Sequence, residues 1–454
     1  MELHKQQQAF FSTQKTKNLS FRRDALKRLR NAIVEQEDAI AEAIYADLKK
    51  PRYESFLGET QFVLGELNAM LKNLEFWARP ERVAANLANF PSKNYVYREP
   101  YGQVLVIAPW NFPFMLAMTP IIGAIAAGNT VVIKPSELTP NTSGILGNII
   151  EKLFDPEYIA VVQGGVEVSQ QLLAQRWDYI FFTGGTQIGK IVYEAAAKYL
   201  TPVTLELGGK NPCIVDETAN ISLAAKRIVW GKALNLGQTC VAPDYLLVHH
   251  SIKEKLVQAL KDKIIAAYGE IRSQSTDLAR IVSDRHHNRL KSLLEDQRIL
   301  FGGETVDRDR FIDLTLVDEP DLDSPLMQEE IFGPILPIFA YTNESDIAKI
   351  IEGYEKPLAA YVFSRRKSFQ KEFITRFGFG GGAINDTVIQ IADKNLPFGG
   401  VGHSGIGAYH GKVSFDLFSH KKAIVKRGSW IDPPIRYAPY TWPKRIAKWI
   451  KHLF

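Results

Sequence analysis

The chain has 454 residues, a formal net charge of +5 and two cysteines, with 46% hydrophobic and 23% charged residues. This is the composition of a soluble globular protein with more than one domain. The small net charge gives no indication of nucleic-acid binding. Two cysteines exclude a secreted disulfide scaffold and favour the cytoplasm, and no Cys/His cluster offers a metal site.

The N-terminal region is predicted to be helical. Residues 1–6 lack the apolar segment of a signal peptide. Residues 20–48 place Leu26, Leu29 and Ile33 at helical spacing, with Ser20 as the expected N-cap. A second helix is expected over residues 56–76.

Short apolar runs then alternate with helical stretches. Strands are predicted at residues 104–107, 130–133, 159–162, 179–182 and 203–206. The interval from Gln103 to Ile133 has no charged residue and is long enough to suggest a membrane span. Prolines at 109, 113 and 120 and the pair Gly128-Asn129 divide it, however, into a strand, a helix over residues 114–127 and a second strand. This pattern is typical of a doubly wound α/β domain with a buried parallel sheet.

A second α/β unit follows, and a separate segment is expected to form an exposed hairpin arm. The strands of the α/β unit are predicted at residues 212–215, 245–248, 335–340, 359–362 and 382–384. Residues 90–106 contain the alternating run Tyr95-Val96-Tyr97-Arg98, which indicates an exposed β arm. Residues 423–426 form the expected partner strand.

Cys240 and Glu206 are the candidate catalytic residues. Cys240 ends the polar run Leu236-Gly237-Gln238-Thr239-Cys240, and Glu206 lies in Leu205-Glu206-Leu207-Gly208-Gly209-Lys210. A thiol in a loop is a candidate nucleophile, and a carboxylate in a Gly-rich turn is a candidate base. The alternative for Cys240 is an inert buried thiol, which is the role expected for Cys213 beside apolar neighbours.

A glycine-rich turn offers a site for phosphate. Thr183-Gly184-Gly185-Thr186-Gln187-Ile188-Gly189 follows a predicted strand and opens a helix, so its N–H groups can face an anion. The turn equally suits a tight strand–helix connection. The usual G-x-G-x-x-G fingerprint does not follow the first strand.

Further motifs occur in a fixed order along the chain. They are Pro109-Trp110-Asn111-Phe112-Pro113, Lys134-Pro135-Ser136-Glu137, Glu329-Glu330-Ile331-Phe332-Gly333-Pro334, the run from Leu396 to Gly405, and Tyr409-His410-Gly411-Lys412. Together with Cys240 and Glu206, they resemble the aldehyde dehydrogenase superfamily from about Phe10 to Lys426. The last two motifs look most like its class 3 branch, which handles fatty and aromatic aldehydes.

The resemblance implies a division of the chain and a reaction. Residues 1–82 and 103–207 would bind NAD(P), and residues 208–414 would carry the thiol. Residues 83–102 and 415–432 would form an oligomerisation arm of a homodimer, followed by a basic tail at residues 433–454. The chain would oxidise hydrophobic aldehydes to carboxylic acids through a thiohemiacetal and a thioester on the cysteine. The carboxylate at 206 favours release of a free acid, because relatives that transfer the acyl group to coenzyme A usually lack it.

The resemblance also assigns roles to individual residues. Asn111 would hold the oxyanion together with the Cys240 backbone N–H. Lys134 and Glu137 would hold the adenosine ribose, where a carboxylate favours NAD and a lysine tolerates the phosphate of NADP, so mixed use is expected. The remaining cofactor contacts would be Trp110, Gly184, Gly185, Thr186, Gln187, Ile188, Gly189, Leu207, Glu330 and Phe332.

Two alternatives belong to other functional classes. One is a thiol hydrolase or acyltransferase that pairs Cys240 with His249, His403 or His410; it explains neither the glycine-rich turn nor the Lys134–Glu137 motif. The other is a non-catalytic descendant of the family. The chain has Cys240, Glu206 and Asn111, which the chemistry needs and which a non-catalytic descendant need not keep. Their presence speaks against this second alternative.

The C-terminal residues 443–454 are predicted to form a short basic amphipathic helix. Ile446, Trp449, Ile450 and Leu453 share one face, and most of the basic side chains lie on the other. Such a helix either lies in a membrane interface or docks on the protein over the substrate entrance. It is too short to span a membrane.

Overall fold

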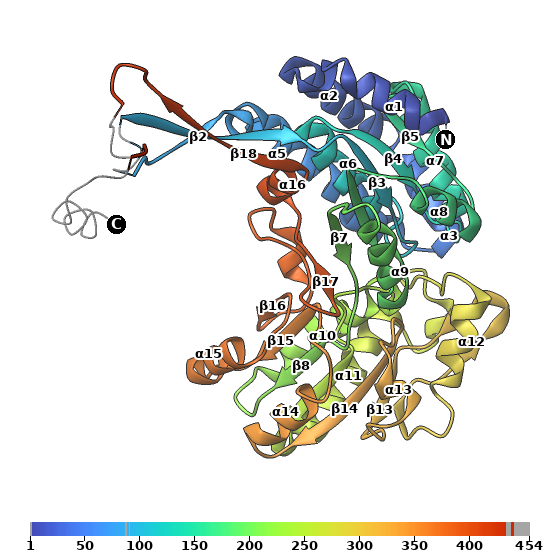
Figure 1. Cartoon of the computed structure of the whole chain (residues 1–454). Helices are drawn as coiled ribbons and strands as arrows, with labels where there is room; N and C mark the ends of the chain where they lie inside the picture. The colour runs from blue at the N-terminus through green and yellow to red at the C-terminus, as the bar shows by residue number, and fades with distance from the viewer. Residues whose placement is uncertain (1, 87–88, 90, 433–436, 440–454) are drawn as a thin grey trace.

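The first sheet consists of short apolar strands that helices cover on both faces. In the computed structural model, which describes residues 2–86, 89, 91–432 and 437–439, parallel strands lie in the order β7-β6-β3-β4-β5 (Figure 1). These strands are β3 (Gln103–Ile107), β4 (Thr130–Lys134), β5 (Ile159–Val161), β6 (Tyr179–Thr183) and β7 (Val203–Glu206). The connecting helices are α6 (Met115–Ala127), α7 (Pro140–Leu153), α8 (Val166–Leu173) and α9 (Thr186–Ala197). The predicted doubly wound sheet is confirmed.

The N-terminal helices differ in detail from the prediction. Their bounds are α1 (Glu2–Ser12), α2 (Leu19–Glu35), α3 (Glu37–Leu48), α4 (Arg52–Ser55) and α5 (Gln61–Ala78). The single helix expected over residues 20–48 is broken at Gln36. Ser20 is not the N-cap, because the side chain of Asn18 accepts the Ser20 N–H at 2.8 Å. A π-helical turn, Phe56–Thr60, precedes α5, and α1 had no prediction.

The second sheet carries all five predicted strands and two more. Its order is β10-β13-β14-β9-β8-β15-β16, parallel except for β10. The strands are β8 (Pro212–Val215), β9 (Tyr245–His249), β10 (Ile299–Phe301), β13 (Thr315–Asp318), β14 (Ile335–Tyr341), β15 (Ala359–Phe363) and β16 (Gly381–Ile384). The helices beside it are α10 (Ile221–Ala233), α11 (Lys253–Tyr268), α12 (Asp284–Ser292), α13 (Pro325–Gln328), α14 (Glu344–Ile351) and α15 (Lys367–Arg376). A small ladder, β11 (Thr305–Val306) with β12 (Phe311–Ile312), lies apart from this sheet.

The predicted arm pairs two strands that lie far apart in the sequence. β2 (Ser92–Pro100) is antiparallel to β18 (Ser419–Arg427), with Val96 opposite Ala423, and β1 (Glu81–Val83) pairs with its other edge. The partner predicted at residues 423–426 is therefore confirmed. Figure 1 shows the two long strands extending away from the body of the molecule.

After the second sheet the chain returns to the first. β17 (Gly405–Ile406) adds antiparallel to β7, and α16 (Gly411–Leu417) packs on α5 and α6. The domain boundaries expected from the sequence stay a prediction. Within the described ranges, no helix is both long and apolar enough to cross a membrane. The tail at residues 443–454 lies outside them.

Candidate active site

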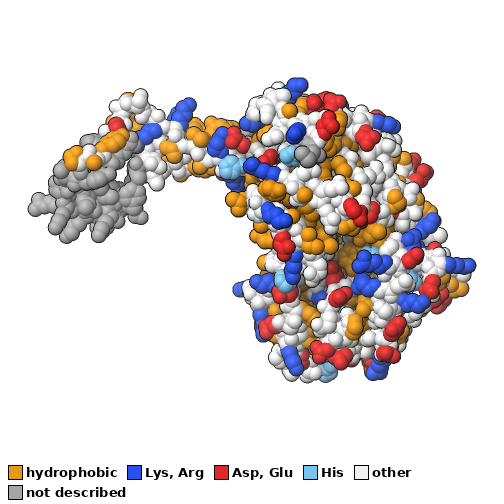
Figure 2. All heavy atoms as spheres, turned by 45° about the vertical axis from the view of Figure 1, so that its right-hand side comes forward, with side chains coloured by type: hydrophobic (Ala, Val, Ile, Leu, Met, Phe, Trp, Pro, Cys, Tyr) orange, Lys and Arg blue, Asp and Glu red, His pale blue; other side chains and the backbone are white. Residues whose placement is uncertain are grey.

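A cleft of about 710 Å³ lies at the carboxyl ends of the parallel strands β3, β6 and β7 and reaches across to the second sheet. Figure 2 shows the surface hollowed there, with basic side chains beside the hollow. Most of the predicted site residues line this cleft: Trp110, Asn111, Gly184, Gly185, Thr186, Gln187, Ile188, Glu206, Leu207, Cys240, Glu330 and Phe332. Lys134, Glu137 and Gly189 do not line it.

The loop before Cys240 has a strained backbone. Asn235, Leu236 and Gly237 follow α10 and all have positive φ values, 50°, 51° and 74°. Hydrogen bonds hold this conformation: the Asn235 N–H donates to Glu54 at 2.7 Å, and its side-chain amide donates to the Asn111 carbonyl at 2.8 Å. Such backbone conformations persist only where the surroundings fix them, which is typical of functional sites.

The two thiols have different environments. Cys240 is half-buried and lines the cleft, whereas Cys213 is fully buried in β8. Burial and the nearby carboxylates of Glu330 and Glu206 raise the pKa of the Cys240 thiol, while the backbone N–H groups of Cys240 and Val241 act against this rise. The resting thiol is therefore protonated at neutral pH and must lose a proton before it reacts.

Glu206 ends β7 with its carboxylate inside the protein. Its side chain is 2% exposed, and neither carboxylate oxygen has a hydrogen-bond partner among the residues described. Burial raises the pKa of Glu206 well above its ordinary value. A buried carboxylate without a partner is costly, so one that persists beside a thiol is suited to accept a proton.

Asn111 follows β3 and is held against the loop formed by residues 235–240, which is called the thiol loop below. Its side-chain amide donates to the Gln238 carbonyl at 3.1 Å, and the residue is 3% exposed. An amide carries two N–H groups, so one remains to face a developing oxyanion while the other fixes the side chain.

A smaller pocket extends from the cleft past Cys240 and Glu206. Apolar side chains form most of its wall: Phe62, Phe112, Met115, Leu116, Leu207, Val241, Leu358, Ile391 and Phe398. His410 also lines it. Burial lowers the pKa of His410 to about 3, and within the described part of the chain neither ring nitrogen has a partner. His410 belongs to the Tyr409-His410-Gly411-Lys412 motif. That motif indicated the class 3 branch, but the sequence predicted no role for this histidine.

The residues near the glycine-rich turn fit a dinucleotide. A Cβ at Gly185 would meet nothing within 4 Å, so the backbone before α9 is open to the cleft. Gly189 has a different use, because a Cβ there would lie 2.7 Å from Leu207 and would push the helix away. At the end of β4, Lys134 donates to Glu137 at 2.6 Å, so a cation and a carboxylate lie together near the cleft.

Glu330 and Phe332 form the opposite wall. Burial raises the pKa of Glu330 to about 8. Gly208 leaves room for that carboxylate, because a Cβ would come within 2.0 Å of its oxygen. The Phe332 ring packs edge-on against Trp110 at 5.3 Å, and His286 lies 5.0 Å from the same indole.

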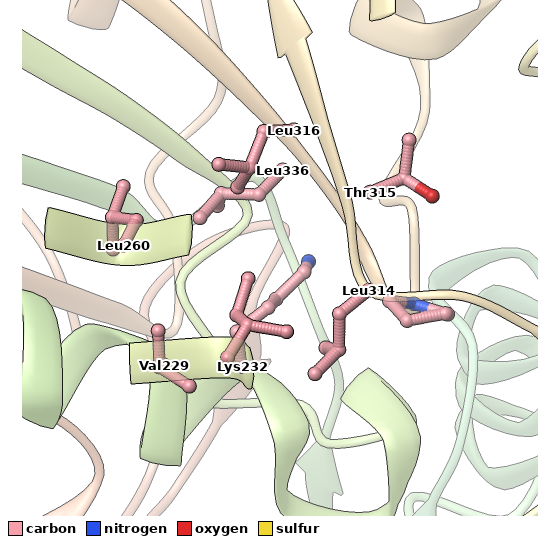
Figure 3. Close-up of a pocket in the computed structure, with 9 residues that line it drawn as sticks. Val229, Lys232, Leu260, Leu314, Thr315, Leu316 and Leu336 are labelled. Carbon is pink, nitrogen blue, oxygen red and sulfur yellow. The ribbon is translucent and has the colours of Figure 1, made fainter. Parts of the chain in front are cut away.

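An internal network of charges fixes this wall. Lys210 pairs with Asp244 at 2.5 Å and donates to the Glu329 carbonyl, and Asp244 accepts the Ile331 N–H at 3.0 Å. Figure 3 shows Lys232 nearby among apolar side chains. Burial lowers the pKa of Lys232 to about 8. The cavity around it is only about 10 Å³, space for no more than about one water.

The histidines do not form a thiol–imidazole pair. His249 ends β9 and bonds Ser251, and His403 lies on the rim of the cleft. Although His410 shares a pocket with Cys240, its pKa makes it a weak base. No hydrogen bond joins Cys240 to a histidine in the described ranges, which argues against a thiol hydrolase of the usual Cys–His type.

Comparison with known proteins places this geometry in a family. The model of the aldehyde dehydrogenase family matches residues 3–424. The chain belongs to this family. Over 98% of its length it is 48% identical to the 4,4'-diaponeurosporen-aldehyde dehydrogenase of Staphylococcus aureus, covering 97% of that protein. It matches a substrate-bound structure of Staphylococcus aureus AldH with a TM-score of 0.97 and 47% identity, over 100% of this chain and 99% of that one.

The chain is thus an NAD(P)-dependent aldehyde dehydrogenase that oxidises aldehydes to acids. Family 3 member A2 of Rattus norvegicus is 46% identical over 92% of this chain and 86% of that protein, in agreement with the expected branch. In this aldehyde dehydrogenase, sequence reasoning missed His286 and Arg289 on α12, which also line the cleft. No motif marks them, because a helix surface with basic residues looks like an ordinary solvated face.

Proposed function

We propose that the chain oxidises hydrophobic aldehydes through a covalent intermediate on Cys240. The observation that carries this proposal is that Cys240 and Glu206 line both the cleft and a small, largely apolar cavity of about 30 Å³ beside it. An aldehyde that enters with its hydrocarbon part against Phe112 and Phe398 would present its carbonyl to the thiol. Desolvation of that hydrocarbon part favours hydrophobic over small polar substrates.

The chain's own groups supply the steps. The Cys240 thiol first releases its proton to solvent through the cleft. The thiolate then attacks the carbonyl carbon, and the oxyanion accepts hydrogen bonds from the Asn111 amide and the Cys240 N–H. The nicotinamide, when bound, supplies the hydride acceptor. Loss of hydride leaves a thioester on Cys240. Glu206 then takes a proton from water, which attacks the thioester carbon and releases the carboxylic acid with a free thiol.

Cofactor use is proposed to be mixed. Lys134 and Glu137 would hold the adenosine ribose, with Gly184 and Gly185 near the pyrophosphate. Support comes from two solved relatives: one from Mycobacterium tuberculosis (26% identical) is complexed with NAD+, and GapN of Methanocaldococcus jannaschii (25% identical) with NADP. In this chain the ion pair between Lys134 and Glu137 offers both a partner for a 2′-phosphate and a group that repels it.

A homodimer through the β2–β18 arm is part of the proposal. Most side chains of β18 are exposed, including Ile424 and Val425, so its outer edge and faces are open to a second copy. A relative from Canis lupus familiaris, 42% identical over 99% of both chains, is named dimeric and NADP-preferring. Sedimentation of the intact chain and of a Val425→Glu variant tests this, since the charge would shift a dimer towards monomer.

Peripheral membrane contact through residues 443–454 rests on the sequence pattern alone. Deleting these residues should reduce sedimentation with anionic liposomes and lower activity more on long-chain than on short-chain aldehydes. Equal behaviour of the truncated and full-length enzymes would leave the segment without either role. The cytoplasmic location stays a prediction.

The central experiment replaces Cys240 with alanine. NAD(P)H formation from an alkanal, followed at 340 nm, should fall below about a hundredth of wild type, with cofactor binding intact. Cys213→Ala is the matched control and should retain activity. Substantial turnover by Cys240→Ala would overturn the proposed nucleophile.

A further inference from the structure

A buried ion pair lies behind the catalytic cleft. Lys50 follows α3, and Glu59 lies in the π-helical turn before α5; their side chains are both 0% exposed and 2.6 Å apart. Taking two charges out of water is expensive unless every remaining hydrogen-bonding position is filled. The other groups that contact these two side chains all lie in residues 111–115.

Both members of the pair bind residues 111–115. The second oxygen of Glu59 accepts the N–H groups of Phe114 and Met115, at 2.9 and 3.0 Å, where α6 begins. Lys50 donates to the Asn111 carbonyl at 3.0 Å, and its ammonium lies 4.0 Å from the centre of the Phe112 ring. The pair therefore holds the backbone from the Asn111 carbonyl to the beginning of α6.

The same carbonyl is joined to the thiol loop. Asn235 donates its amide to the Asn111 oxygen at 2.8 Å and its backbone N–H to Glu54 at 2.7 Å. Residues 50–59 thus contact the asparagine that follows β3 and the strained loop that leads to Cys240. Asn111 lies in the loop after β3 of the first sheet and Cys240 in the loop before β9 of the second, so their relative placement depends on contacts of this kind.

We propose that Lys50 and Glu59 are positioning residues for the oxyanion site. They act through the Asn111 main chain, and the proposal rests on the oxyanion role proposed above for the Asn111 amide. Without the lysine, the Asn111 carbonyl loses a charged donor and Glu59 is left as an unpaired buried charge. The loop then shifts, and the amide no longer meets the oxyanion at hydrogen-bonding distance.

The test is a double-mutant cycle read out as the pre-steady-state burst of NAD(P)H. Lys50→Met should slow the burst by at least about tenfold, a part of the loss expected for a missing oxyanion donor. The dissociation constant for NAD+, measured by fluorescence quenching, should stay within about twofold. In an Asn111→Ala background, adding Lys50→Met should slow the burst by less than about twofold, because the group being positioned is gone.

Lys49→Met is the matched control, since this neighbour is exposed and makes no contact with residues 111–115 that the structure describes. If Lys50→Met does not fold, Glu59→Gln takes its place, because it removes the charge at nearly constant shape. A normal burst in Lys50→Met or Glu59→Gln, or equal losses in both backgrounds, overturns the positioning role. A normal burst in Asn111→Ala alone would instead overturn the oxyanion role.

Discussion

Gly237 lies against Gly333 so closely that a Cβ at position 237 would come within 2.3 Å of the Gly333 carbonyl oxygen. This contact joins the thiol loop to the motif that contains Phe332. Both partners are backbone, so neither can move aside alone. The cofactor wall and the nucleophile loop are therefore placed relative to each other by a main-chain contact.

Gly237→Ala should impair catalysis through this contact. The substitution adds a clash with backbone at a φ of 74°, a conformation that costs non-glycine residues about 1–2 kcal/mol. We expect kcat/KM to fall at least about tenfold and the melting temperature to drop. Gly402→Ala is the control, because its φ is 67° and a Cβ there would meet nothing within 4 Å. Equal effects of the two substitutions would show that backbone strain, not the contact, matters.

The reactivity of Cys240 should depend on the charge at Glu330. Because burial and Glu330 raise the thiol pKa, alkylation by iodoacetamide should be slow at neutral pH and should accelerate as the pH rises. Glu330→Gln should accelerate alkylation most above pH 8, where Glu330, with a pKa of about 8, carries its charge. Peptide mass spectrometry checks the site, with Cys213 as the unreactive internal reference. An unchanged alkylation rate in the variant would show that the Glu330 charge does not affect the Cys240 thiol.

Glu206→Gln should separate acylation from hydrolysis. The variant should give a burst of NAD(P)H with little steady-state turnover, because the thioester forms but no base activates water. In the wild type, the raised pKa of Glu206 means that the basic form accumulates only as pH rises, so hydrolysis of a preformed acyl-enzyme should accelerate with pH. The variant should lose that acceleration. If the burst and the steady-state turnover of Glu206→Gln fell by the same factor, Glu206 would not be the base that acts in thioester hydrolysis.

Glu137 should control the choice between the two cofactors. Removing its charge with Glu137→Gln should raise kcat/KM for NADP relative to NAD by roughly tenfold, because repulsion of the 2′-phosphate disappears. Lys134→Met should change the ratio in the opposite direction. Steady-state kinetics with both cofactors measures each ratio. If neither variant changes it, the 2′ position is recognised elsewhere.

The fold was predictable where the sequence is strongly patterned. Apolar runs bounded by glycine and proline located the strands of the first sheet, because strands buried on both faces tolerate few polar residues. The break at Gln36 was missed, since apolar spacing continues through it. β10 and β13 were missed because short strands near a sheet edge carry little pattern of their own.

The site was predictable only where chemistry leaves a local signature. Cys240, Glu206 and Asn111 lie in motifs, and the structure brings them to one cleft. Lys50 and Glu59 gave no signal, because nothing in a sequence distinguishes a fully buried lysine from the many exposed ones. Their role depends on a long-range contact with residues 111–115, which only the folded chain shows.

The return of β17 to β7 has a consequence for synthesis on the ribosome. The strand that ends in Glu206 pairs on one side with residues 405–406, and β2 pairs with residues 419–427. Until these late residues leave the exit tunnel, both strands present unpaired edges of the kind that promote aggregation. The nascent chain therefore cannot complete its first sheet from its N-terminal half alone, and the growing polypeptide should need protection by a chaperone until translation is nearly finished.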